Sequence, residues 1–245
     1  MTRRTLIFVG PTLPAAEVAR LAPQAEVRPP AACGDILRAL SNVNGRNIAR
    51  VTCIALIDGY FERMAAVWHK ELLLALEQGI AVYGAASMGA LRAAELDAFG
   101  MIGVGAIYNA YRRGALTCDD EVAVAHLPAS AGYRAVSDAL VNLRDGLALA
   151  SRARVISPRT RDALIELARA RFYRERSWSQ LILDGNSAQL PARQLAALAA
   201  WPKPDRKATD ARLLLAALAR APGHAAPRVR VPRTWALRRF AAQIR

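Results

Sequence analysis

The fold is decided by the stretch from Val51 to Leu96, which reads VTCIALIDGYFERMAAVWHKELLLALEQGIAVYGAASMGALRAAEL. It contains two short apolar runs typical of buried strands, at 51–57 and at 80–83. Two further segments, 66–78 and 88–96, repeat their apolar side chains at helical spacing. The alternation of strand and helix at such short intervals predicts parallel strands joined by crossover helices.

The residues before this stretch continue the same alternation. An apolar run at Thr5–Val9 precedes a helical segment at 14–21, and a brief strand at 25–28 precedes a helix that starts at Asp35 and ends near Leu40. We therefore expect an α/β fold with a mainly parallel, Rossmann-like sheet and flanking helices. Such sheets bind ligands at the carboxyl ends of their strands.

The residues after Leu96 change in character. Gly100–Gly105 (GMIGVG) is predicted to be a glycine-rich bend, and Val122–Ala125 a last short strand. Helical patterns follow at about 133–150, 158–173, 177–184, 191–200 and 208–220. The last twenty residues, which contain Pro222, Pro227 and Pro232, suggest an extended arm and a short basic amphipathic end. The sequence thus predicts an α/β core domain at 1–130 and a basic helical region with a C-terminal arm at 131–245.

The charge of +14 is confined to the second half of the chain. Residues 1–145 carry 14 basic and 14 acidic side chains, residues 146–200 nine against four, and residues 201–245 eleven against two. This excess fits either a solvated helical face or an acidic partner such as a protein, nucleic acid or membrane surface. Only three of the 34 basic residues are lysines, and Lys70 is the only one before Lys203. A compact ammonium in an arginine-rich chain points to a chemical requirement or to chance retention.

Cysteine usage and hydropathy indicate a protein of the cytoplasm without a membrane span. Cys33, Cys53 and Cys118 are odd in number and form no CxxC, which argues against a disulfide framework or a zinc knuckle. No apolar run approaches the roughly 18 residues of a membrane helix, and the N-terminal apolar stretch is too short for a signal peptide. The chain contains neither GxxxxGK[ST] nor a GxGxxG after a strand, so no nucleotide motif is present. We expect no cofactor.

The segment GAASMGALRAAEL (84–96) is the first candidate for chemistry. A strand leads through small residues into Ser87 and directly into a helix, as in elbows that hold a nucleophile at the edge of a sheet. The backbone amides of Met88 and Gly89 would then face a developing oxyanion. The alternative is that Ser87 is an ordinary N-cap.

The second candidate is the helix that follows the strand ending at Asp58. His69 shares one helical face with three leucines, so we expect it to point inward, toward the sheet. Near the first turn of its helix an imidazolium is disfavoured, so a neutral His69 could accept a proton. The alternative is a core histidine bonded to a backbone carbonyl. Asp58 could orient His69, balance Lys70 or bind substrate, or it could be a turn residue.

A third segment, TCDDEVAVAH (117–126), contains carboxylates and a histidine. On a strand, Asp120 and His126 would share one face, where they could contribute to a metal site. The spacing is not diagnostic, and a solvated acidic turn is the favoured interpretation of the segment. No metal site is therefore predicted.

Five motifs, taken together and in this order, resemble the TfuA-like family. They are IDGYF (57–61), AVWHKEL (66–72), VYGAASMGALRAAEL (82–96), FGMIGVGAIY (99–108) and DDEVAVAH (119–126). The resemblance covers about residues 50–130 and extends to the first strand, FVGPTLP. It implies a partner of YcaO cyclodehydratase-like enzymes in making thioamides on peptide backbones. In that role YcaO activates the amide with ATP, and the partner brings or liberates sulfur, for instance from a thiocarboxylated ubiquitin-like carrier.

The resemblance suggests a mechanism for the candidate residues. Ser87, or a water beside it, attacks the carrier's thiocarboxylate with His69 as base, while the Met88 and Gly89 amides stabilise the oxyanion. Lys70 or Arg92 neutralises the anionic tail, and Glu71 or Glu95 holds those cations in place. We expect hydroxyl, imidazole and ammonium groups to converge in one pocket at the edge of the sheet. The precursor peptide would be reached only indirectly, through YcaO.

Three other interpretations of the function remain open. The chain could be a non-catalytic adaptor that docks YcaO and the sulfur carrier. It could relay a persulfide through Cys33 or Cys118, whereas Cys53, in mid-strand, is expected to be inert. Nucleic-acid binding through the basic residues is disfavoured, because no aromatic stacking pattern accompanies the arginines.

Overall fold

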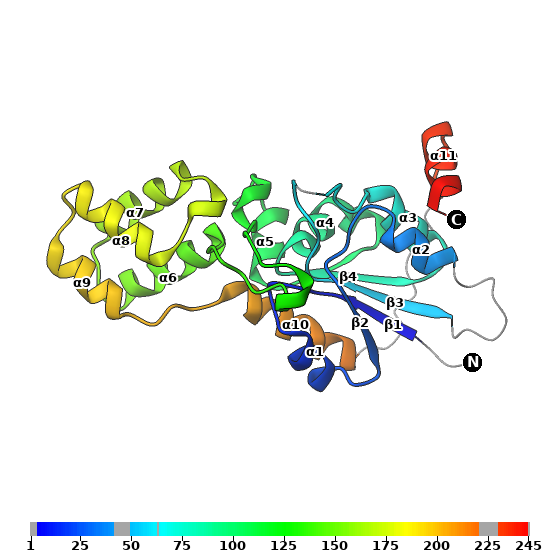
Figure 1. The fold of residues 1–245 in the computed structure, drawn as a ribbon, viewed down its shortest axis with the longest axis horizontal. Coiled ribbons are helices and arrows are strands. Elements are labelled where there is room, and N and C mark those ends of the chain that lie inside the picture. The colour runs from blue at the N-terminus through cyan, green and yellow to red at the C-terminus, as the bar shows by residue number, and fades with distance from the viewer. Residues whose placement is uncertain (1–3, 42–49, 63, 221–229, 245) are drawn as a thin grey trace. The chain divides into compact units, whose positions relative to one another are not determined.

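The structure is a computed structural model that describes residues 4–41, 50–62, 64–220 and 230–244. The chain divides into two compact units (Figure 1). Unit 1 comprises Met1–Thr117 and Ala208–Arg245, and unit 2 comprises Cys118–Lys207. These units are defined by spatial contacts. The division into a core domain at 1–130 and a helical region at 131–245 stays a prediction.

Unit 1 contains a five-stranded sheet in which all strands are parallel, which confirms the predicted α/β fold class with a mainly parallel sheet. Its strands are β1 (Arg4–Phe8), β2 (Ala25–Arg28), β3 (Val51–Leu56), β4 (Ala81–Ala85) and β5 (Ile102–Val104), in the order β2-β1-β3-β4-β5. The register is regular across the centre, with Ile7 opposite Ala55 and Ala55 opposite Tyr83. The first crossover places β2 on one side of β1, and the second places β3 on the other side of β1. The order in which strands are added therefore reverses between β1 and β3. In such sheets the crevice outside the carboxyl ends of these two strands is the usual ligand site.

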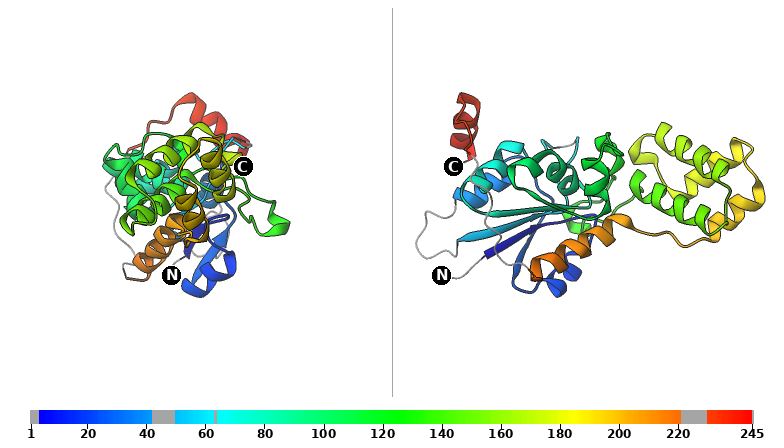
Figure 2. Two further views of the ribbon diagram at one scale, coloured as in Figure 1. Left: turned by 90° about the vertical axis from the view of Figure 1, so that its left-hand side faces the viewer. Right: turned by 180° about the vertical axis from the view of Figure 1, so that it is seen from behind.

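Helices cover both faces of this sheet. Figures 1 and 2 show α2 (Asp35–Ser41), α3 (His69–Glu77), α4 (Met88–Leu96) and α5 (Ala106–Arg112) on one face, and α1 (Ala15–Leu21) and α10 (Arg206–Arg220) on the other. The second face is completed by α10, whose buried Ala211, Leu214 and Leu215 join the same apolar cluster as Ile7 and Tyr83. This helix, which the sequence places in the helical second half, is therefore part of the α/β core.

Four local predictions differ from the structure, one of them in unit 2, where the helix predicted at about 133–150 spans Leu140–Arg152. The glycine-rich bend at 100–105 contains β5, a short strand whose residues are only half-buried and therefore lack a strong apolar pattern. No strand forms at Val122–Ala125, so that prediction is wrong. The preceding Asp119–Glu121 turns as a 3₁₀ helix, η3, and its carboxylates are held by arginines rather than by a strand register. The helix predicted from residue 66 starts at His69, because Ala66 forms an isolated β-bridge with Ala32.

Unit 2 is helical. It contains α6 (Leu140–Arg152), α7 (Pro158–Ala170), α8 (Trp178–Ser187) and α9 (Ala192–Ala200). Leu143, Leu147, Leu164, Leu181 and Leu195 belong to its own apolar core. The buried Arg176 ties the unit together, since its guanidinium donates to the carbonyls of Ala168 and Asp120 and to the Asp120 carboxylate.

The C-terminal segment belongs to unit 1, as α10 does. Val231–Thr234 is followed by α11 (Trp235–Ile244), which contacts α2. The predicted arm falls partly at Pro222 and Pro227, which lie outside the described residues. Within the described ranges, none of the helices has the length and apolar character needed to cross a bilayer.

Candidate functional site

The predicted elbow is present between β4 and α4. The strand ends at Ala85 and the helix begins at Met88. The buried Ala86 between them has a φ of 67°, and the Ser87 amide donates to the Ala85 carbonyl at 2.8 Å. A residue other than glycine with positive φ carries backbone strain, which is concentrated at functional sites. The strained tip of the elbow is therefore Ala86, whose side chain is a methyl group, and not Ser87.

Ser87 lies one residue further, at the start of the helix. It occupies the N-cap position, and its carbonyl accepts from the amides of Ala90 and Leu91. Its hydroxyl makes no capping hydrogen bond to the first turn. Its side chain is almost wholly buried, with 8% of the residue exposed. The position of a cap is thus confirmed, but the hydroxyl does not perform a cap's usual task.

The glycines of the elbow serve close packing of the helix on the sheet. A Cβ atom on Gly89 would lie 1.7 Å from the Leu56 carbonyl oxygen, and one on Gly84 would lie 2.1 Å from the Gly89 carbonyl oxygen. The Gly89 amide donates to the Ile57 carbonyl at 3.2 Å. An oxyanion role for this amide would require that bond to break. The amide is committed to joining α4 to the end of β3.

Asp58 follows the carboxyl end of β3, and its side chain binds the loop that follows β1. Only 1% of the residue is exposed. Its carboxylate accepts from the amides of Gly10 and Thr12, at 2.8 and 3.0 Å, and from the Thr12 hydroxyl at 2.6 Å. Backbone amides in this loop are what a phosphate group would use in a nucleotide-binding sheet. Asp58 takes that place, so its bonds hold the loop after β1 rather than His69 or Lys70.

Glu71 fills a second cluster of backbone amides. Its fully buried carboxylate accepts two bonds of 2.9 Å from the Gly34 amide, one of 3.3 Å from Leu37 and one of 3.1 Å from Trp68. These bonds join the start of α2 to the start of α3. Burial raises the pKa of Glu71, although the amide donors oppose the shift. Burial, and secondly Glu71, raises the pKa of the neighbouring Cys33 thiol to about 11.

His69, Arg92 and Glu95 come together on the surface of α3 and α4. Glu95 Oε2 lies 2.8 Å from His69 Nε2 and accepts from the Arg92 guanidinium at 2.6 Å. Arg92 also donates to the Val67 carbonyl at 3.1 Å, which fixes the arginine between the two helices. The expectation that His69 points inward is wrong, because 47% of its side chain is exposed. As the first residue of α3, His69 precedes the turns whose leucines face the core.

This cluster can hold and move a proton. When Glu95 is ionised and His69 neutral, the proton of the imidazole sits on Nε2, where it donates to the carboxylate. His69 Nδ1 is then the atom that can accept a proton from a substrate or a water. The arrangement of carboxylate, imidazole and guanidinium is a candidate acid–base site, open to solvent.

Lys70 is directed elsewhere. Its ammonium donates to the Thr234 hydroxyl of the C-terminal segment at 2.9 Å. Glu95 follows Ser87 by eight residues, which is about 12 Å along the axis of α4. The predicted residues therefore form three separate groups: Ser87 in the elbow, His69 with Arg92 and Glu95, and Lys70 with Thr234. Asp58 and Glu71 form the buried framework beneath them.

Sequence reasoning missed Ala86, Thr12 and Thr234. Positive φ at an alanine leaves no trace in a single sequence, and the Thr12 and Thr234 partners are 46 and 164 positions away from the residues they bind. Among the residues that the structure describes, no group of three or more His, Cys, Asp and Glu side chains could hold a metal ion. The acidic turn at 119–121 is instead paired with Arg144 and Arg176.

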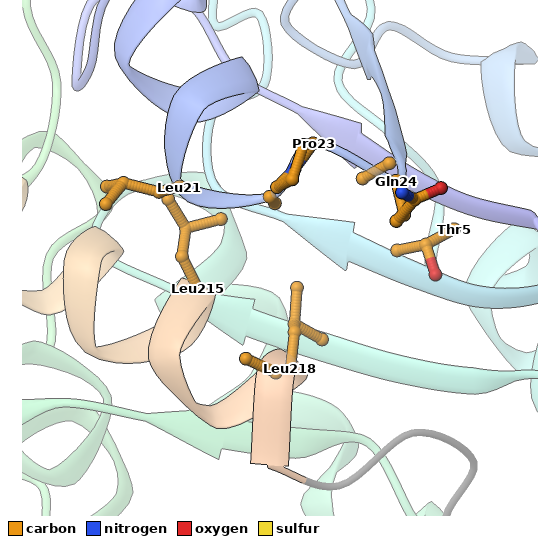
Figure 3. A pocket seen from close by; sticks show the side chains of 9 residues that line it. Thr5, Leu21, Pro23, Gln24, Leu215 and Leu218 are labelled. Carbon is orange, nitrogen blue, oxygen red and sulfur yellow. The ribbon is translucent and has the colours of Figure 1, made fainter.

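A small cavity lies on the opposite face of the sheet from α3 and α4. It has a volume of about 200 Å³ and is lined by Leu21, Pro23, Gln24, Leu215 and Leu218 among others (Figure 3). Its walls come from the end of α1, the start of β2 and the last turns of α10. None of the predicted site residues lines it, so it is not the expected pocket.

Comparison with known proteins identifies the family. No curated protein matches the chain. A family model described as TfuA-like protein matches residues 58–177, a range that begins at Asp58 and includes every predicted site residue. It also includes η3, α6, α7 and Arg176 of unit 2, whereas α10 and α11 lie beyond it. The chain therefore belongs to the TfuA-like family.

Proposed function

We propose that this protein is a TfuA-like accessory protein for YcaO-dependent thioamide formation on peptide backbones, and that it releases sulfide from a thiocarboxylated ubiquitin-like carrier. The observation that carries the proposal is the family match over residues 58–177, since membership suggests a role in thioamide formation with YcaO. The precursor peptide would meet YcaO rather than this chain. The proposed location is the cytoplasm, where such carriers and free thiols are kept.

The proposed chemistry is hydrolysis of the carrier's C-terminal thiocarboxylate. The oxygen of a water attacks the carbonyl carbon, the carbon–sulfur bond breaks, and a carboxylate and hydrogen sulfide are the products. His69 Nδ1 takes the water proton and returns it to the departing sulfur, while Glu95 holds the opposite nitrogen at 2.8 Å. Arg92, bonded to the same carboxylate, lies near enough to the imidazole to lower the cost of bringing in an anion.

The roles of the other candidates are narrower in this proposal. Ser87 is 8% exposed, so attack by its hydroxyl would require the carrier's tail to enter the elbow, with the Met88 amide as oxyanion donor. Attack by water at the exposed His69 requires no such entry. Lys70 would attract the anionic tail once it is released from Thr234. Asp58 and Glu71 hold the loops and act through position only.

A sulfide-release assay tests the hydrolase proposal. Purified full-length protein is incubated with a thiocarboxylated carrier, and sulfide is measured for wild type, His69→Gln, Glu95→Gln, and Ser87→Ala combined with Lys70→Ala. His126→Gln and Ser179→Ala are the histidine and serine controls, because neither residue belongs to the candidate site. We expect loss of release in His69→Gln and unchanged release in both controls. No release by the wild type excludes hydrolysis, and full release by every site variant excludes these residues as the site at which it occurs.

The second candidate function is a non-catalytic adaptor that docks YcaO and the carrier. It is favoured by the Gly89 amide, which is bonded to Ile57 instead of being available to an oxyanion. An adaptor predicts that the His69→Gln variant supports thioamide formation in a complete reaction with YcaO. A persulfide relay is disfavoured at Cys33, whose raised pKa of about 11 keeps the thiol protonated. Thioamide formation by a variant with all three cysteines changed to serine would exclude the relay, including through the exposed Cys118.

A further inference from the structure

The C-terminal segment lies along α3, in the opposite direction to it. At the start of the segment the Val231 amide donates to Glu77 at 2.9 Å, and the Arg233 guanidinium binds the same carboxylate. Thr234 accepts from Lys70, and the Phe240 ring lies 4.4 Å from the Trp68 ring. As the segment proceeds from residue 231 to residue 240, its partners proceed from the last residue of α3 to the N-cap residue of the same helix.

The docked segment buries apolar side chains and covers functional ones. Val231 and Leu237 are 6% and 2% exposed, although they belong to a short segment at the chain's end. Lys70, the only lysine before Lys203, is half-buried with its ammonium on Thr234. Lys70 and Trp68 directly flank His69, whose imidazole remains exposed. The segment therefore covers the cation beside the candidate acid–base site but not the base itself.

We infer that Val231–Ile244 is a releasable clasp that occupies the surface of α3 and withholds Lys70 from anionic ligands until it is displaced. The physical basis is a small, mixed interface. Two buried aliphatic side chains, one aromatic contact and one carboxylate anchor hold the segment, and such contacts open without unfolding the sheet beneath them. The inference rests on the proposed function only in giving Lys70 an anionic ligand.

The clasp also has an exposed face. Trp235 is 72% exposed, and the Arg239 guanidinium lies 5.2 Å from the centre of its ring. Arg230 and Arg238 are exposed as well. The buried side of the segment, with Val231 and Leu237, is thus distinct from a basic side that is open while the clasp is closed. An acidic protein surface fits the basic face and could bind it before the segment leaves α3.

Lysine acylation of the native full-length protein tests the clasp without any substrate. The chain has only three lysines, so the labelling rate of Lys70 can be followed by mass spectrometry with Lys203 as internal reference. We expect Leu237→Asp to raise the Lys70 rate at least fivefold and to leave the Lys203 rate unchanged. Leu213→Asp is the matched control, because Leu213 is a 51% exposed leucine of α10, and it should change neither rate.

Two outcomes would overturn the inference. One is equal Lys70 labelling in wild type and Leu237→Asp, with both proteins folded by circular dichroism. The other is hydrogen exchange of amides 235–244 at the rate of an unfolded peptide in the wild type, which would mean that the segment is not docked. Should Leu237→Asp unfold, Phe240→Ala serves in its place. Sulfide release tests the proposed function separately: its absence leaves the labelling result intact.

Discussion

Two groups of carboxylates in unit 1 differ in almost every physical respect. Asp58 and Glu71 are buried and bind backbone amides, whereas Glu95 and Glu77 are partly exposed and bind side chains or the C-terminal segment. The four residues are nonetheless neighbours in the fold, because Asp58 follows β3, Glu71 and Glu77 lie on α3, and Glu95 lies on α4. The candidate residues therefore divide into two kinds. Asp58 and Glu71 form a buried framework, whereas Glu95 and Glu77 are accessible from solvent. Burial, and not residue type, decides which role each one can take.

The largest effect is expected for Asp58→Ala. Removing the carboxylate leaves two amides and a hydroxyl without their acceptor in a buried crevice, which should lower the free energy of unfolding by about 3–5 kcal/mol. Urea unfolding followed by circular dichroism measures it. Asp162→Ala, at a side chain that is 63% exposed, should change the free energy by less than about 0.5 kcal/mol. Equal losses of unfolding free energy in the two variants would mean that the Asp58 carboxylate does not stabilise the fold.

Glu71→Gln should remove a pH dependence of stability. Because the folded pKa of Glu71 is raised, its contribution is fully present below the unfolded value of 4.5 and is lost as pH rises through the folded pKa. As pH rises through this range, the free energy of unfolding of the wild type should fall relative to that of the variant. The fall should be about 1.4 kcal/mol for each unit by which the folded pKa is raised. Urea unfolding of both proteins from pH 4 to 8 gives the difference. If the wild type instead becomes more stable than the variant as pH rises, the pKa of Glu71 is not raised in the folded protein.

His69→Gln should separate the two groups most clearly. The imidazole is exposed, so the free energy of unfolding should change by less than about 0.5 kcal/mol. If the proposed hydrolysis is correct, sulfide release should fall by about 100-fold or more through loss of the base. Thermal unfolding and the release assay measure the two effects on one sample. A variant that loses stability and activity together would place His69 in the framework instead.

The smallest effect is expected at Glu77. The Val231 amide, followed by Arg233, lowers the pKa of Glu77, so docking of the C-terminal segment gains from the carboxylate above pH 4.5. That gain is lost as pH falls through the lowered pKa. Hydrogen exchange of amides 235–244, corrected for its intrinsic pH dependence, should accelerate over this range in the wild type. In Glu77→Gln the corrected rate should be higher and flat with pH, whereas Glu17→Gln should behave as the wild type.

The sequence predicted the architecture wherever the pattern was local. The strands at Thr5–Val9 and Val51–Ile57 and the helix at Met88–Leu96 follow from apolar periodicity and from the turn residues beside them. β5 was missed because a three-residue strand with a central glycine has no periodicity to detect. The return of α10 to the sheet was missed because amphipathic spacing shows that a helix has an apolar face but not which surface covers it.

The site was predicted in composition but not in arrangement. Arg92 and Glu95 could be paired with each other from their spacing on α4, yet the link to His69 depends on how two helices approach. The prediction that His69 points inward was wrong because the helix starts three residues later than its apolar pattern suggests. Backbone amides as partners of Asp58 and Glu71 are invisible to reasoning that compares only side chains.

The late position of α10 in the chain has a consequence for biosynthesis. The ribosome finishes the five strands before it reaches residue 117, but the helix that covers one face of their sheet begins only after the whole of unit 2 has been made. At 5–20 residues per second, the intervening segment takes on the order of 5–20 s to synthesise. For that time the face of the nascent sheet with Ile7, Ala55 and Tyr83 lacks the cover of α10 and has only that of α1, so apolar surface that the finished protein buries stays exposed during synthesis.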